Sequence, residues 1–165
     1  MRDRVTGERA RDVIHGGDQG RQRQSGSEDM KTAFFAKVVS FSDDGDATVL
    51  AFADEPMEPA NYVILDLANE PDEQELRLGL DGVHIEAGPL RVDGYDMVQD
   101  IRESDAGIVI SLTPDAARHA GTDQDIEIEL GNRIVDGISI GEAVQRFRDR
   151  LSSTGGTRAK AFGSD

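Results

Sequence analysis

Three histidines and one aspartate-rich segment are the residues of this 165-residue chain that could support catalysis or metal binding. His84 is the strongest candidate, because Asp81 and Glu86 lie near it and Glu86 shares its face if the segment is extended. Such a pair could act as a general base. A surface histidine beside an acid is far more common, however, and the histidines lack the paired spacing of a zinc site. We therefore expect no catalytic residue, no metal site and no cofactor.

The segment Asp43-Asp44-Gly45-Asp46 resembles the start of a calcium-binding loop. An EF-hand loop also needs a glutamate at its twelfth position and a helix on either side. The twelfth position here is Asp54, and the flanking segments are typical of strands. We therefore predict a hairpin turn at this segment rather than a calcium site.

The charge of the chain is strongly negative and unevenly distributed. The net charge is −15, and residues 43–136 contain 24 acidic residues against five arginines, a net charge of −19. Such a segment repels nucleic acids and anionic lipids and attracts basic proteins. Because 15 of the 18 basic residues are arginines, the acidity is equally compatible with the background composition of a GC-rich genome.

The chain is expected to act as one soluble, cytoplasmic domain. It has no cysteine, no apolar run long enough to span a membrane and no apolar secretory signal at its N-terminus. Residues 1–29 have the composition of a disordered tail and could be an upstream mis-assigned start. We predict a single folded domain at 30–151 and a flexible C-terminal tail at 152–165.

The apolar pattern predicts an α+β fold of six to eight short, mostly antiparallel strands, one short helix and a C-terminal helix packed on the sheet. The expected strands are 32–41, 47–53, 62–67, 97–103, 107–112 and 125–130. The short helix follows Thr113 and stops at Gly121. The C-terminal helix starts at a capping box, Ser139 with Glu142, and carries an apolar stripe of Ile140, Val144, Phe147 and Leu151.

A central stretch, 73–86, is predicted to form a half-buried hairpin. Leu76, Leu78 and Leu80 alternate with other residues, and Asp81-Gly82 is a turn signal. Val83 and Ile85 then resume the alternation, with His84 and Glu86 on the opposite face. The segment that follows, 88–96, contains Pro89 and Gly94 and is expected to be irregular.

Several motifs in the middle of the chain resemble the immunity protein 10 family. They are Phe35-Ala36-Lys37-Val38-Val39, Glu58-Pro59-Ala60-Asn61-Tyr62-Val63-Ile64-Leu65, Glu73-Gln74-Glu75, Leu78-Gly79-Leu80-Asp81-Gly82-Val83-His84-Ile85-Glu86 and Gly94-Tyr95. The resemblance covers roughly residues 31–130. Family members often carry an aromatic pair where Val83-His84 stands, and a glycine-rich run where Asp96-Met97 stands. If these positions touch a partner, the partner of this chain differs from those of its relatives.

The resemblance implies a bacterial immunity protein of a polymorphic toxin system, which binds and neutralises a cognate toxin protein. An acidic inhibitor suits a basic, nucleic-acid-cleaving toxin. The residues that we expect to face the partner are Glu73, Glu75, Asp81, His84, Glu86 and Tyr95. Two alternatives remain at this stage: an acidic structural or adaptor domain with no toxin partner, and an enzyme that uses His84. We expect no nucleic-acid or membrane partner, and the sequence leaves the oligomeric state open.

Overall fold

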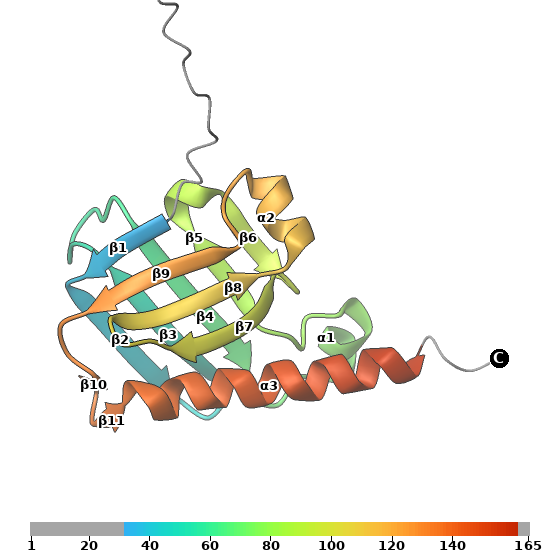
Figure 1. The fold of residues 1–165 in the computed structure, drawn as a ribbon. Helices are drawn as coiled ribbons and strands as arrows, with labels where there is room; N and C mark the ends of the chain where they lie inside the picture. The colour runs from blue at the N-terminus through green and yellow to red at the C-terminus, as the bar shows by residue number, and fades with distance from the viewer. Residues whose placement is uncertain (1–31, 162–165) are drawn as a thin grey trace, which may run out of the picture.

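The computed structural model describes residues 32–161, so the predicted tail at 1–29 lies outside the described residues. Two β-sheets are stacked face to face, with the four-stranded sheet in front of the five-stranded sheet in Figure 1. A helix runs along one edge of this sandwich and a shorter helix caps one end. The predicted α+β class, with mostly antiparallel strands and a C-terminal helix packed on a sheet, is confirmed.

The first apolar segment forms two strands rather than the one that we predicted. β1 (Thr32–Ala36) lies in the four-stranded sheet and β2 (Val38–Asp43) in the five-stranded sheet, with a bend at Lys37 between them. Both faces of the segment are apolar because each half must bury residues between the sheets. Splits of this kind, and two very short strands, raise the number of described strands to eleven from the predicted six to eight.

The five-stranded sheet is antiparallel throughout, in the order β2-β3-β4-β5-β6. Its remaining strands are β3 (Ala47–Ala53), β4 (Tyr62–Ala68), β5 (His84–Ala87) and β6 (Val92–Tyr95). The segment 88–96 is therefore not irregular, because a 3-10 turn at Gly88–Leu90 leads directly into β6. In β3, β4 and β5, residues alternate between buried and partly exposed, which defines an inner and an outer face.

The central stretch is not a hairpin. Residues Glu73–Leu78 form the helix α1, and only the end of the stretch, from His84, enters a strand. The side chain of Asp72 caps the helix, and Gly79 ends it in a left-handed conformation with φ 70°. The alternation of three leucines suggested a strand, but α1 buries none of its residues. Without burial, the spacing of apolar residues does not distinguish a strand from a short helix.

The four-stranded sheet has the order β1-β9-β8-β7, and only the β1–β9 pair is parallel. Its members are β7 (Val98–Glu103), β8 (Gly107–Leu112) and β9 (Asp125–Leu130), all close to the predicted strands. A Cβ atom at Gly107 would lie 2.0 Å from the backbone oxygen of Ile128, so the pairing of β8 with β9 requires glycine at this position. The helix α2 (Pro114–Ala120) connects β8 to β9, with the predicted cap at Thr113 and stop at Gly121.

After a small hairpin of β10 (Ile134–Val135) and β11 (Ile138–Ser139), the helix α3 (Ile140–Ala161) packs against β7 at the sheet edge (Figure 1). The predicted capping box is present: the Glu142 amide donates to Ser139 Oγ, and the Ser139 amide donates to Glu142 Oε2. Of the predicted stripe, Ile140, Val144 and Phe147 are buried. The helix continues ten residues beyond its predicted end at Leu151.

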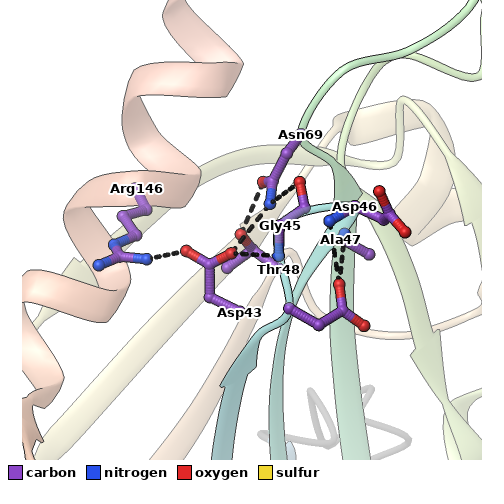
Figure 2. A network of polar contacts seen from close by, with 8 residues as sticks. Asp43, Gly45, Asp46, Ala47, Thr48, Asn69 and Arg146 are labelled. Atoms are coloured by element: carbon purple, nitrogen blue, oxygen red, sulfur yellow. Dashed lines mark hydrogen bonds and ion pairs between the residues drawn. The ribbon is translucent and has the colours of Figure 1, made fainter.

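Polar contacts tie α3 to one end of the five-stranded sheet (Figure 2). Asp43 pairs with Arg146 of α3 and accepts hydrogen bonds from the Gly45 amide and Asn69 Nδ2. Asn69 Oδ1 accepts from the buried Thr48 hydroxyl at 2.7 Å. The aspartate-rich segment is thus the predicted hairpin turn, and its Asp43 carboxylate also links that turn to α3.

The stripe on α3 yields a stability prediction. Phe147 is fully buried in the core, so Phe147→Ala should lower the free energy of unfolding by about 3–5 kcal/mol. Arg148 lies half-exposed on the same helix and its ion pair with Asp100 is at the surface, so Arg148→Ala should cost less than about 1 kcal/mol. Urea unfolding of the two variants checks this, and similar losses for both would mean that the core side of α3 is misassigned.

Candidate functional site

The outer face of β4, β5 and β6 carries a dense group of polar and aromatic side chains. Alternation along each strand sends their neighbours into the core and these residues outward. The outward residues are Tyr62, Ile64, Asp66, His84, Glu86, Asp93 and Tyr95. Three of the six predicted partner-facing residues, His84, Glu86 and Tyr95, are therefore brought together on this face.

His84 is held by residues of β6, the strand that sequence reasoning missed. Its Nε2 atom lies 3.0 Å from Asp93 Oδ1, and its ring packs on that of Tyr95 at a centroid distance of 4.9 Å. His84 and Tyr95 are direct cross-strand partners, which explains the ring contact. The general-base pair of His84 with Glu86 is therefore not formed. The Nε2 atom of His84 contacts Asp93 instead.

Glu86 accepts a hydrogen bond from the Tyr62 hydroxyl at 2.8 Å. This hydrogen bond to Glu86 raises the pKa of Tyr62 above 10.0, with burial and the charges of Glu86 and Asp93 acting in the same direction. The carboxylate therefore fixes the tyrosine ring on the outer face. An aromatic ring held in one orientation loses less entropy when a partner binds it.

Tyr95 links the sheet face to α1. Burial raises its pKa above 10.0, and the negative charges of Asp66 and Glu75 raise it further. Asp66 stands on β4 opposite His84, whereas Glu75 belongs to α1. The charge of α1 therefore acts on the outer face at Tyr95.

The other predicted residues lie on or next to α1. Glu73 is in its first turn, and Glu75 closes a capping box by accepting from the Asp72 amide at 2.9 Å. Asp81 follows the helix, and its backbone oxygen accepts from Arg150 Nη1 at 3.4 Å. Two α1 residues that we expected to point inward, Leu76 and Leu78, are instead 52% and 63% exposed.

We call this combined surface, α1 with the outward residues of β4 to β6, the acidic face. Its acids are Asp66, Asp72, Glu73, Glu75, Asp81, Glu86 and Asp93. Arg77 is the one lysine or arginine within α1, β4, β5 and β6, and Arg150 of α3 reaches the edge of this face at Asp81. A surface of this charge attracts cations and basic proteins. Within the part of the chain that the structure describes, no group of three His, Asp or Glu side chains could hold a metal ion.

Comparison with known families assigns the chain. The family model described as Immunity protein 10 matches residues 35–136, more than half of the chain. The chain belongs to the immunity protein 10 family. The resemblance noted in the motifs is thereby confirmed, and the match includes α1, the whole acidic face and both sheets except the first residues of β1. A search of curated proteins found no match.

The two departures from the usual family motifs now have places in the structure. Val83 is buried, so it cannot touch a partner, whereas His84 reaches the acidic face. Asp96 is exposed directly after β6, with a left-handed backbone at φ 60°. Of the positions at which we expected a departure from the family pattern, His84 and Asp96 are therefore at the surface.

Sequence reasoning missed several residues of the acidic face. Tyr62 and Asp66 alternate with buried residues of β4, and that signal could have found them. Asp93 was missed because β6 is short and contains a glycine.

No described helix is long and apolar enough to cross a membrane.

The tyrosine contacts predict a specific titration behaviour. Replacing Glu86 by Gln should lower the pKa of Tyr62, because a neutral amide no longer disfavours the phenolate, and should leave Tyr95 unchanged. The chain has two tyrosines, so Tyr95→Phe and Tyr62→Phe backgrounds isolate each in a titration by ultraviolet absorbance. An equal response of both tyrosines would contradict the separate contacts.

The same shifts determine how stability depends on pH. Each folded-state pKa lies above the value of about 10 for an unfolded chain. The contribution of the two phenols is therefore complete below about pH 10 and is lost as the pH rises through the folded pKa.

Proposed function

We propose that this chain is an immunity protein that binds a cognate bacterial toxin domain and neutralises it by covering the functional surface of the toxin. Membership of the immunity protein 10 family supports a protein partner. The observation that carries the proposal is the acidic face, a charged surface with partly exposed aromatic rings that neighbouring side chains hold in place. We place this activity in the cytoplasm, without a catalytic step.

The charge of the surface favours a basic toxin. The seven carboxylates outnumber Arg77 and the adjacent Arg150, which donates to the Asp81 backbone oxygen, so the field over the acidic face is negative. A toxin that cleaves nucleic acid must itself attract polyanions and is therefore basic around its active site. Opposite fields accelerate the encounter of two proteins and orient them before contact. A basic nuclease is thus the toxin class that fits this surface best.

The aromatic side chains supply the contact itself. Tyr95 and Tyr62 combine a large ring with a polar tip, a combination that is enriched at binding hot spots. Both are partly exposed and held by neighbours, Tyr95 by the His84 ring and Tyr62 by Glu86. Rings that are ordered before binding lose less entropy in the complex.

A second candidate function, an acidic adaptor domain without a toxin, would use the same surface. The two differ in one observation: an immunity protein protects cells that express the toxin domain encoded beside it, and an adaptor does not. The enzyme alternative through His84 would require a measurable reaction that His84→Ala abolishes.

The proposal predicts how variants of the acidic face change binding rates. Glu73→Gln/Glu75→Gln should slow association with the neighbouring toxin domain, most strongly at low salt, since such fields are screened within about 8 Å at physiological ionic strength. Glutamine at position 75 can still complete the capping box, so the helix is retained. Tyr95→Ala should instead speed dissociation, with little salt dependence. Association and dissociation rates at two salt concentrations test both.

The matched control removes two acids from the opposite surface. Glu127→Gln/Glu129→Gln changes the outer side of β9 in the four-stranded sheet and should slow association less than the α1 pair does. If the variants at Glu73/Glu75 and at Tyr95 bind and protect cells like the parent, the interface lies elsewhere.

A further inference from the structure

Helix α1 does not bury any of its own residues, although two of its six residues are leucines. Leu76 and Leu78 are 52% and 63% exposed. A surface helix of a globular protein normally turns its apolar residues toward the core. Here no residue of α1 is buried, and two large apolar side chains within one helical turn, on different sides of the helix, remain largely exposed.

The helix is nevertheless held at both ends by hydrogen bonds. A six-residue helix is unstable alone, because nucleation costs more than so few hydrogen bonds return. The capping box satisfies its first amides, and at its end the Gly79 amide donates to backbone oxygens of Glu75 and Leu76. Arg150 of α3 then clamps both flanks, donating to the backbone oxygens of Asn69 at 3.0 Å and Asp81. The leucines are thus presented on a preorganised support.

Acids surround these leucines. Between Glu70 and Asp81 there are five acidic residues and one arginine, a net charge of −4. Glu75, the residue before Leu76, lies near enough to Tyr95 for its charge to act on that side chain. An apolar centre with a charged, solvated rim is the usual arrangement of a protein–protein interface.

We propose that α1 is the apolar anchor of the complex, with Leu76 and Leu78 packing from two sides of the helix against an apolar cleft that Lys and Arg side chains surround on the toxin. This inference rests on the proposed function and specifies which element of the acidic face becomes buried. The partner chemistry follows from charge complementarity, since an apolar cleft with an acidic rim would repel this helix.

A rival apolar surface lies at β1 and β10, on the side of the sandwich away from α1 (Figure 1). Phe35 and Ile134, 48% and 64% exposed, flank a groove of about 340 Å³. Its lysine, Lys37, is paired with Glu55, and the Asp136 carboxylate accepts the Phe41 amide at 2.9 Å. This groove therefore lacks a rim of one charge that would select a basic partner, and it provides a matched control.

The experiment measures binding of the full chain to the toxin domain encoded beside it, with the double variants Leu76→Ala/Leu78→Ala and Phe35→Ala/Ile134→Ala. Alanine favours the helix, so α1 should persist and the melting temperature should stay close to that of the parent. We expect the leucine pair to raise Kd by about tenfold or more, through faster dissociation and with little salt dependence. The Phe35/Ile134 pair should leave Kd within about twofold of the parent.

The outcomes separate this inference from the proposed function. If the parent binds and protects but the leucine variant does so equally well, α1 is not the anchor and the proposed function stands. If the Phe35/Ile134 variant alone weakens binding, the groove is the apolar contact and the inference is wrong. If the parent neither binds nor protects, the proposed function fails and the inference fails with it.

Discussion

The packing of the two sheets against each other is the constraint on which the rest of this structure depends. Every strand of the five-stranded sheet must turn alternate residues toward the four-stranded sheet, and Leu50, Leu65 and Ile85 are fully buried as a result. The facing strands contribute Ile110 and Ile126, also fully buried. Because each inward residue is committed to this core, its neighbours on the outer face are free to carry charge and aromatic rings.

The same constraint explains how one segment serves both sheets. Residues 32–43 begin beside β9 and, after the bend at Lys37, continue beside β3. A chain that crosses between stacked sheets fastens them covalently at that corner. On another side, α3 closes the edge at β7, and its Arg146 and Arg150 reach the loops at one end of the five-stranded sheet. The sheet that carries the acidic face is thus held by the chain crossing at Lys37 and by the contacts of α3.

Much of this fold could be predicted from the sequence where local signals and core burial agree. The alternation of β9 and the stripe of α3 follow burial in the core, and the caps of α2 are local hydrogen-bonding signals. Helix α1 escaped because it buries nothing, so its leucines followed no core-directed period. Its capping box, Asp72 with Glu75, was a signal that outweighed the alternation. On the acidic face, the contact of His84 with Asp93 depends on the register of β5 with β6. The local sequence pattern does not predict that register.

The most direct test is hydrogen exchange of the full chain, alone and bound to the toxin domain that we propose as its partner. If the acidic face is the binding surface, the amides of α1 and of β5 and β6 should exchange more slowly in the complex, while those of β1 and β9 should not change. Protection confined to β1 and β9, with no effect between residues 72 and 95, would contradict the assignment of the toxin contact to this face.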